Sequence, residues 1–542
     1  FKERFLPMNV KEHENGYVTY TTDLIPKYSG VHYYYFSYTS NGVRHYIKRG
    51  DACHGTLDQG EMFQLTVYNE DYQTPQFLKG GVMYQIFPDR FCSSGKMHDN
   101  VPSDRVMREW GKLPYYKPDQ NGHVWNNDYF GGDLDGIRSK LDYLKDLGVT
   151  CIYLNPIFES HENHRYNTAD YLNVDPLLGT NEEFEVLCRE AAKYGIGIVL
   201  DGVFSHTGSD SRYFNREGRY GEGGAYRDPN SPYRSWYDFD PKYKGGYRSW
   251  WGFETLPEVN EETPSFVEFI TGEGGVIDTW LRRGAAGFRL DVADELPDVF
   301  IEKIRTAVKR VSPEKFLLGE VWEGATTKFG FDHRRTYLLG KGLDSVMNYP
   351  LRCAVIDFFT GVIDAYQLRR VILHQQEVYP APFYYSLMNL LGSHDRVRIL
   401  NAMCGLNREG AAQMDRAEAK KITLGKRELK SAKKRYLEAM KLLCALPGAP
   451  TVYYGDEIGM TGMADPWNRA PMNWDDPDEK LLEGVRELLH KRRDNPVLQT
   501  GYLEVEAVDA DTLRITRCAR EGKDVFGEPL AGKAVMVKVS RK

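Results

Sequence analysis

The sequence predicts an α/β protein whose main domain is a closed barrel of eight parallel strands, each leading into a helix. Strand-like apolar runs recur eight times, and amphipathic segments with apolar residues at three- and four-residue spacing separate most of them. The runs span residues 81–87, 149–157, 196–204, 287–293, 315–322, 345–351, 384–395 and 449–457. An open doubly wound sheet is the alternative, and the count of eight favours the (β/α)8, or TIM, barrel.

Regions rich in strand patterns flank the predicted barrel on both sides. Residues 1–76 alternate aromatic or β-branched residues with polar ones, which predicts an N-terminal all-β, sandwich-like domain. Strand patterns return beyond residue 490. We therefore expect the barrel over residues 77–490 and a C-terminal β domain, short or truncated, over 491–542.

One connection of the barrel is too long to be an ordinary loop. Between the third and fourth strands a helix is expected at about 264–283, and residues 205–262 remain, which predicts an inserted subdomain. This stretch holds 13 aromatic residues in 58. Most of them are expected to fill the small core of the insertion, and some to form stacking platforms for sugar rings.

The composition argues against several classes of partner. The 70 Lys and Arg against 77 Asp and Glu leave a net charge of −7, which does not suit binding to nucleic acid or to an anionic membrane. No apolar run of about 18 residues is present, so no membrane span is expected. The eight cysteines form no CxxC pair, which favours free core thiols and a reducing, cytoplasmic location.

Polar residues gather where the predicted strands end. In a parallel barrel the carboxyl ends of all strands share one face, and catalytic groups lie there. The residues at these ends are Asp201, His206, Arg289, Asp291, Glu320, His394 and Asp395. Any one of them alone could be a helix cap or an ion-pair partner. Burying all of them at one mouth costs stability, which chains tolerate mainly at functional sites.

These residue types match the hydrolysis of a glycosidic bond, which needs one ionised and one protonated carboxyl. Arg289 is expected to lower the pKa of Asp291, two residues away, and to keep it anionic as the nucleophile. Apolar neighbours are expected to raise the pKa of Glu320, which would then be the general acid/base. Adjacent strands about 4.8 Å apart could deliver the separation of about 5–5.5 Å that a retaining enzyme uses.

The remaining polar side chains could bind the sugar or a metal ion. Asp395 is expected as a third catalytic carboxylate that grips and strains the sugar, and His206 and His394 as hydrogen-bond partners of the same sugar. A catalytic metal is the competing use of such residues. The sequence has no HxH or HExxH pairing among them, so no metal ligand is predicted.

At these residues the chain resembles the α-amylase family, glycoside hydrolase family 13. Four segments are similar to the family's barrel motifs, in order and on the matching strands: DGVFSH (201–206), GFRLDVADE (287–295), LLGEVW (317–322) and LLGSHD (390–395). Further segments that resemble family motifs are NHRYNTADY (163–171), LPEVN (256–260) and NRAPMNWD (468–475). The resemblance covers about residues 77–490.

The resemblance implies a substrate-binding set around the catalytic carboxylates. Tyr166 is expected to stack under the sugar at the cleavage point, and Asp465 and Arg469 to grip the non-reducing sugar. Trp322, two residues after the predicted acid, is expected to line the acceptor side. The strand-end residues that join this set are Asp201, His206, Arg289 and His394.

Within the family, the chain is similar to the neopullulanase, cyclomaltodextrinase and amylopullulanase group. The similarity lies in YQIFPDRF (84–91), FGGDLDGI (130–137) and the β-rich N-terminal region, which resembles a carbohydrate-binding domain. It implies cleavage of α-1,4 bonds, often with α-1,6 bonds, in maltodextrins, pullulan, starch or cyclodextrins, by a monomer or a homodimer. The alternatives are a transglycosylase or α-1,6 debranching enzyme of the same family, and an inert sugar-binding homologue. Such a homologue lacks the nucleophile or the acid, and this chain has both.

Two departures from the family bear on calcium, which many relatives bind. Ser205 stands where the family usually has an asparagine ligand, and CSSGKMHDN (92–100) stands where relatives with a calcium site carry Asn and Asp in quick succession. Asp99, Asn100 and Asp133 remain as oxygen donors. We therefore expect no required cofactor, with calcium only weakly supported.

Overall fold

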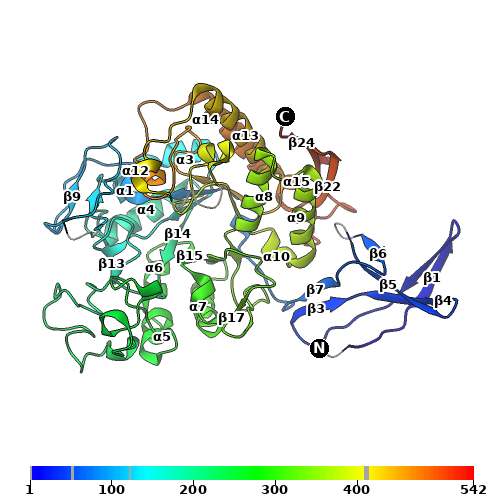
Figure 1. Ribbon diagram of the computed structural model, residues 1–542, viewed down its shortest axis with the longest axis horizontal. Coiled ribbons are helices and arrows are strands. Elements are labelled where there is room, and N and C mark those ends of the chain that lie inside the picture. Colours follow the sequence, from blue (N-terminus) through cyan, green and yellow to red (C-terminus); the bar gives the residue numbers. More distant parts are fainter. Residues whose placement is uncertain (1–2, 51–53, 121–123, 408–413) are drawn as a thin grey trace.

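The computed structural model describes residues 3–50, 54–120, 124–407 and 414–542, and a barrel of eight parallel strands forms its centre (Figure 1). Strands β8, β11, β14, β15, β16 and β19 are neighbours in chain order, and β21 joins β8 to β20. A parallel bridge between Met347 and Met388 links β19 to β20 and closes the ring. The strands are β8 (Met83–Ile86), β11 (Cys151–Leu154), β14 (Gly197–Gly202), β15 (Gly287–Leu290), β16 (Phe316–Gly319), β19 (Ser345–Val346), β20 (Met388–Leu390) and β21 (Ala449–Tyr453). The predicted barrel is confirmed.

The strand register aims one set of side chains at the barrel axis. Tyr153 lies opposite Gln85, and Arg289 lies opposite Asp201. Because side chains alternate along a strand, inward apolar residues near the strand starts give way to inward polar residues at the ends. The interior cluster is apolar and buried, with Met83, Cys151, Val199, Phe316, Leu318 and Met388 among its members. The barrel core thus forms the floor of a polar mouth.

Amphipathic helices form the outer layer of the barrel (Figure 1). In α4 the side chains of Phe184, Leu187, Cys188 and Ala191 are buried at three- and four-residue spacing. A capping box formed by Thr180 and Glu183 begins this helix. The larger helices are α4 (Asn181–Lys193), α7 (Asp298–Val311), α8 (Tyr349–Thr360), α9 (Ala365–Val378), α13 (Lys426–Ala445) and α14 (Glu479–Arg493).

The single helix predicted at about 264–283 is wrong. Two helices occupy this stretch, α5 (Pro264–Thr271) and α6 (Val276–Arg282). Glycines interrupt the segment between them, and Gly274 adopts a φ of 73°, a left-handed conformation that a helix interior does not allow. The apolar spacing continued across the break, so periodicity alone did not reveal it.

The insertion between β14 and α5 contains only short 3-10 turns and is held by an aromatic core. The buried aromatics are Tyr213, Phe214, Trp236, Tyr237 and Tyr247. Three others are exposed: Trp251 at 77%, Phe253 at 57% and Tyr226 at 42%. The aromatic content of this stretch therefore serves both as core and as exposed ring surface.

We expect a pH-dependent stability effect at Glu261, in the same insertion. Burial raises the pKa of its carboxyl to about 8, with a further rise from Glu258 and a partial offset from Arg248. The folded chain therefore holds a proton that the unfolded chain releases, and stability falls as pH rises from about 4.5 to 8. Glu261→Gln should raise the melting temperature by about 2 °C or more at pH 8.5 and change it little at pH 4.5. Calorimetry at both pH values tests this, and an equal shift at both would contradict it.

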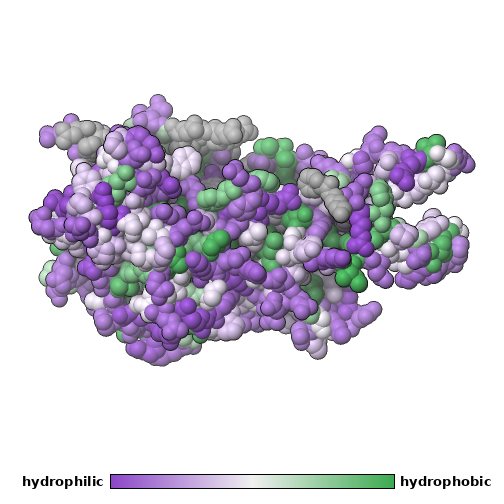
Figure 2. Space-filling model, turned by 90° about the horizontal axis from the view of Figure 1, so that it is seen from below, coloured by the Kyte–Doolittle hydropathy of each residue, from purple (hydrophilic) through white to green (hydrophobic). Residues whose placement is uncertain are grey.

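Small antiparallel sheets flank the barrel. At the N-terminal side β1 (Asn9–Glu14) pairs with β2 (Tyr17–Thr21), β3 (Gly30–Tyr34) pairs with β7 (Phe63–Val67), and β4 (Phe36–Ser40), β5 (Val43–Arg49) and β6 (Gly55–Leu57) form a third sheet. At the C-terminal side β22 (Tyr502–Asp509), β23 (Thr512–Cys518) and β24 (Val535–Ser540) form one sheet. The N-terminal strands extend away from the barrel, and Figure 2 shows hydrophobic residues on this arm as well as scattered over the body. The exact domain boundaries stay a prediction.

Two further sequence expectations concern cysteines and membranes. The cysteines that the structure describes are all free, and Cys92, Cys151, Cys188 and Cys444 are buried. Cys53 lies outside the described residues. Among the helices of the described ranges, none combines the length and the apolar character that a bilayer crossing requires.

Candidate active site

The centre of the polar mouth is Arg289, a fully buried guanidinium on β15. Its Nη1 donates to Oδ1 of Asp201 at 2.7 Å and to Oδ1 of Asp291 at 2.8 Å. Its Nη2 lies 2.9 Å from Oε2 of Glu320. One guanidinium therefore links three strand ends and places Asp291 and Glu320 on the same side of the mouth. The two carboxyl groups are buried but not sealed, with side chains 9% and 6% exposed.

Backbone geometry after Asp291 ties it to Glu320. Val292 adopts φ 39° and ψ 46°, a left-handed conformation that a β-branched residue rarely adopts. In this conformation its backbone N–H donates to Oε2 of Glu320 at 2.8 Å. The indole N–H of Trp322 donates to the other oxygen, Oε1, at 3.1 Å. The strain at Val292 thus accompanies a fixed position for the Glu320 carboxyl.

The expectation that Arg289 lowers the pKa of Asp291 is wrong in its net direction. Burial raises the pKa of Asp291 well above its ordinary value, and Glu320 and Asp201 add to the rise, while Arg289 opposes it. Burial also raises the pKa of Glu320, as expected, with Arg289 again opposing. Arg289 has to serve three carboxylates at once, so it cannot keep all of them ionised. The cluster shares protons, and its carboxyls titrate together.

His394 and Tyr166 form a network beside the carboxylates. The Tyr166 hydroxyl donates to Oδ2 of Asp201 at 2.9 Å and lies 2.6 Å from Nε2 of His394. The two rings are stacked with centroids 5.5 Å apart and an interplanar angle of 9°. Gln85 contacts Nδ1 of His394 at 2.8 Å, and Tyr153 donates to Asp201 at 2.7 Å. Sequence reasoning missed Gln85 and Tyr153, whose inward positions at the ends of β8 and β11 could have indicated them.

His206 follows strand β14 and is buried. Its Nδ1 lies 2.9 Å from the Ser205 hydroxyl, and its buried Nε2 has no hydrogen-bond partner within the described part of the chain. Burial lowers the pKa of His206 to about 3, so the ring is neutral near pH 7. The ring of Trp250 lies 5.3 Å away, centroid to centroid. An unpaired buried nitrogen costs stability unless a ligand completes it.

Asp395, Asp465 and Arg469 form the opposite rim. Arg469 reaches Oδ1 of Asp465 at 3.0 Å and Oδ1 of Asp395 at 3.5 Å. Oδ2 of Asp395 lies 3.1 Å from Nε2 of His394, which joins this rim to the network around Tyr166. Asp395 is more open than the other two carboxyls, with 28% of its side chain exposed. Together with the contacts of Arg289, Tyr166 and Trp322, these contacts join every residue predicted for the site except His206, whose ring contacts Ser205 and Trp250 instead.

Trp322 is clamped between side chains that sequence reasoning did not identify. Its ring stacks on Tyr349 with centroids 4.0 Å apart and an interplanar angle of 5°. The Arg396 guanidinium lies 4.2 Å from the Trp322 ring centroid. These contacts fix the indole whose N–H binds Glu320. They join residues from three different strand ends, a proximity that one sequence does not reveal.

Asp133, one of the three candidate calcium donors, has both carboxylate oxygens engaged by hydrogen-bond donors. Oδ1 of Asp133 accepts from the backbone N–H of Gly136 at 2.6 Å, because Asp133 begins helix α2 (Leu134–Ser139) as its N-cap. Its other oxygen lies 3.0 Å from Nε2 of His98 and accepts from the Ser94 hydroxyl. Hydrogen-bond donors thus surround this carboxylate, whereas calcium needs six to eight oxygens.

A parallel barrel with two carboxyls bridged by a buried arginine at its carboxyl-terminal mouth defines a glycosidase-type site. Residues 85–496 match the family described as alpha amylase, catalytic domain. The chain belongs to the α-amylase family, which confirms the resemblance found in its sequence.

Two named relatives represent two kinds of enzyme within the family. The chain is 38% identical over 538 residues to an amylopullulanase of Thermoanaerobacter thermohydrosulfuricus, covering 91% of this chain and 35% of that protein. It is 31% identical to a cyclomaltodextrinase of Geobacillus thermopakistaniensis, covering 90% of this chain and 74% of that protein. The chain thus spans about a third of the length of the amylopullulanase.

The chain is also similar to solved structures of hydrolases named for cyclic α-glucans. A cyclic α-maltosyl-(1→6)-maltose hydrolase of Arthrobacter globiformis, solved with its cyclic maltosyl-maltose, has a TM-score of 0.68 at 32% identity, covering 83% of this chain and 90% of that one. A cyclomaltodextrinase has a TM-score of 0.70 at 25% identity, covering 98% of this chain and 82% of that one.

Proposed function

We propose that the chain is a retaining hydrolase of α-1,4-glucosidic bonds in maltodextrins and related α-glucans, with α-1,6 bonds as an additional target. The observation that carries the proposal is the bridge through Arg289, which contacts Asp291 at 2.8 Å and Glu320 at 2.9 Å. A retaining mechanism needs two carboxyls about 5–5.5 Å apart on either side of one bond. Two groups held by one guanidinium suit that separation better than the wider spacing of inverting enzymes.

In this mechanism Asp291 attacks the anomeric carbon while Glu320 gives a proton to the leaving oxygen. The C–O bond to the leaving sugar breaks, a covalent glucosyl ester of Asp291 forms, and the leaving sugar departs as an alcohol. Water, deprotonated by Glu320, then attacks the anomeric carbon and releases Asp291. The raised pKa values of the carboxyl cluster supply the one proton that this cycle needs. The nucleophile and acid roles come from the family resemblance.

The surrounding groups would hold the sugar at the cleavage point. The half-open carboxyl of Asp395 would bind sugar hydroxyls, and the buried, unpaired Nε2 of His206 would be a further partner. The rim formed by Asp465 and Arg469 would bind the non-reducing sugar, and Trp322 would face the acceptor sugar. The relatives named for pullulan and cyclic maltodextrins support an α-glucan as the substrate.

Pullulan digestion tests the bond preference. The purified protein is incubated with pullulan, and the products are separated by chromatography. Panose as product indicates cleavage of α-1,4 bonds, and maltotriose indicates cleavage of α-1,6 bonds. Proton NMR of a maltodextrin digest, recorded before mutarotation, should show α-configured new reducing ends. Newly formed β ends would refute retention, and a lack of turnover on maltodextrin and pullulan would refute the proposed function. A high yield of longer products would favour the transglycosylase alternative.

An aromatic shelf formed by Trp250, Trp251 and Phe253 stands beside His206. The indoles of Trp250 and Trp251 donate to the two oxygens of Glu295 at 2.7 and 2.9 Å. Trp251 has a φ of 52° and is 77% exposed, and Phe253 is also exposed. Holding large apolar rings in solvent by a strained backbone is costly, and flat rings of this kind stack on sugar faces. The shelf suits glucose units beyond the cleavage point.

Trp251→Ala should lower kcat/KM for long maltodextrins by about fivefold, because one stacking contact is worth about 1 kcal/mol. The shortest substrates should be cleaved at the wild-type rate, since they do not reach the shelf. Steady-state kinetics on maltodextrins of increasing length measures the effect. Tyr366→Ala, which removes an exposed ring on helix α9, is the matched control. An equal loss on all lengths would contradict the shelf's role.

A further inference from the structure

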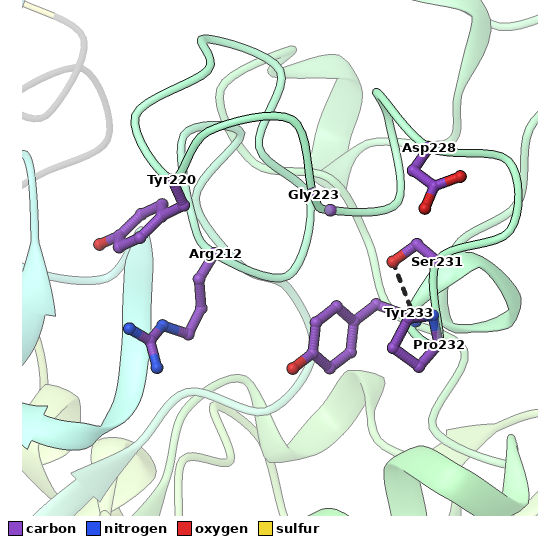
Figure 3. Close-up of a pocket in the computed structure, with 8 residues that line it drawn as sticks. Arg212, Tyr220, Gly223, Asp228, Ser231, Pro232 and Tyr233 are labelled. Atoms are coloured by element: carbon purple, nitrogen blue, oxygen red, sulfur yellow. Dashed lines mark hydrogen bonds between the residues drawn. The ribbon is translucent and has the colours of Figure 1, made fainter.

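The inserted subdomain carries a cavity of 390 Å³ that is separate from the catalytic mouth. None of the residues that line it belongs to the site described above. Its polar lining includes Arg212, Tyr220, Asp228 and Tyr233, and Gly223 lies at its wall (Figure 3). A volume of this size is sufficient for a small ligand.

Arg212 is fixed in the wall of this cavity. The neighbouring Tyr213 is buried in the aromatic core, whereas Arg212 has 44% of its side chain exposed. Its Nη1 lies 3.1 Å from Oδ2 of the buried Asp170. Its guanidinium lies 5.4 Å from the centroid of the Tyr220 ring. The charge of Arg212 is thus already balanced, while its planar edge is held in place.

Two tyrosine rings lie on either side of Arg212 in Figure 3. Tyr233 is held edge-on by Tyr213 at 5.3 Å and by Trp236 at 4.8 Å, centroid to centroid. Among the described residues no hydrogen bond involves its hydroxyl, which makes it available to a ligand. The Tyr220 hydroxyl donates to Glu159 at 2.5 Å. Rings fixed in this way lose little entropy when a ligand packs on them.

The opposite wall carries a carboxylate without a cationic partner. Asp228 accepts from the backbone N–H of Asn230 at 2.8 Å, and no ion pair within the described ranges uses it. With Arg212 balanced by Asp170, the cavity has no excess positive charge and does not suit an anion such as phosphate. Its hydroxyls and charged groups do not suit a purely apolar ligand. A neutral ligand rich in hydroxyls fits, with sugar faces on the tyrosines and hydroxyls on Asp228 and Arg212.

We propose that this cavity is a second α-glucan-binding site, which holds one part of a polymer while another part enters the catalytic mouth. The choice of glucan among neutral sugars rests on the proposed function. Because the two sites would be joined through one substrate chain, the second site would add to the affinity for polymers and not for short oligosaccharides.

A steric block tests the site. A Cβ added at Gly223 meets no atom within 4 Å, and its φ is not in the left-handed region, so Gly223→Leu should fold and occupy the cavity. Asp228→Ala removes the free carboxylate. Glu222→Leu is the matched control, because Glu222 is adjacent and its side chain is 98% exposed. Dissociation constants for amylopectin are measured by retardation in native gels, in the Asp291→Asn background. The kcat/KM for p-nitrophenyl maltoside is measured with Asp291 intact.

Gly223→Leu should raise the amylopectin dissociation constant about tenfold and Asp228→Ala several-fold, with Glu222→Leu unchanged. The kcat/KM for the maltoside should stay at the parent value in all three. Dissociation constants within twofold of the parent in both cavity variants would overturn the proposal, as would an equal effect of Glu222→Leu. If the parent binds amylopectin through the cavity but cleaves no α-glucan, the second site stands and the proposed function fails. If the parent cleaves α-glucans but the cavity variants bind amylopectin as tightly as the parent, the proposed function stands and the second site fails.

Discussion

Asp291→Asn should reduce the turnover of maltodextrins by more than about 10⁴-fold, a larger loss than an acid/base residue alone supplies. The amide keeps the shape of the side chain and can still meet Arg289, so the fold should survive. It cannot form the ester with the anomeric carbon. Turnover of p-nitrophenyl maltoside, followed by release of nitrophenolate, measures the loss. Asp146→Asn, which changes an exposed carboxylate on helix α3 (Leu141–Leu147), serves as the control and should keep full activity.

Rescue by azide identifies which carboxyl is the nucleophile. In Asp291→Ala, azide should enter the space left by the side chain and displace nitrophenolate directly, forming one C–N bond as the C–O bond breaks. A single displacement inverts the anomeric centre, so a β-maltosyl azide is expected. Recovery of an α-azide from this variant would mean that another residue forms the covalent intermediate, and the role given to Asp291 would be wrong.

The barrel was predictable because each of its strands is a buried apolar run, and the structure has a strand within every predicted segment. Strand lengths were not predictable. The run at 384–395 contains only the three residues Met388–Leu390 as strand. It begins at the end of the short helix α10 (Ala381–Tyr384) and ends in a turn that bears His394 and the partly exposed Asp395. The apolar content of a segment indicates that it is buried. Its hydrogen bonding to neighbouring strands ends where the strands diverge, and the position of that divergence depends on the geometry of the whole barrel.

The residue types of the site were predictable from the sequence. The contacts that these residues share with one another were not. The two-residue spacing of Arg289 and Asp291 predicts that they lie side by side. It does not show that Asp201 and Glu320 use the same guanidinium. The sign of the pKa shift at Asp291 depends on that sharing. The hydrogen bond from the Val292 N–H to Glu320 was not predictable from side chains either, because it depends on the left-handed backbone conformation of Val292. The resemblance to the family indicated which groups would react, and only the folded structure shows how they constrain one another.

Glu320→Ala should slow the hydrolysis of maltodextrins by about 10²–10⁴-fold, because a sugar leaving group needs a proton. Formation of the glycosyl ester from p-nitrophenyl maltoside should be much less affected, since nitrophenolate leaves without one, so a burst followed by slow turnover is expected. Azide should restore turnover here by attacking the ester of Asp291. Two displacements retain configuration, and the product should be the α-azide, opposite to that of Asp291→Ala.

The pH profile of the same variant tests the shared titration. In the wild type the acid must be protonated, and burial raises the pKa of Glu320 above its ordinary value. Activity should therefore persist above the ordinary pKa of a glutamate and fall as pH rises through the raised one. In Glu320→Ala this alkaline limb should disappear from kcat/KM for maltodextrins, whose sugar leaving group needs the proton, while the acidic limb should move to lower pH. That shift is expected because Glu320 no longer raises the pKa of Asp291. If the alkaline limb survives the loss of Glu320, the proton comes from another member of the cluster, and Asp395 would be the next carboxyl to replace.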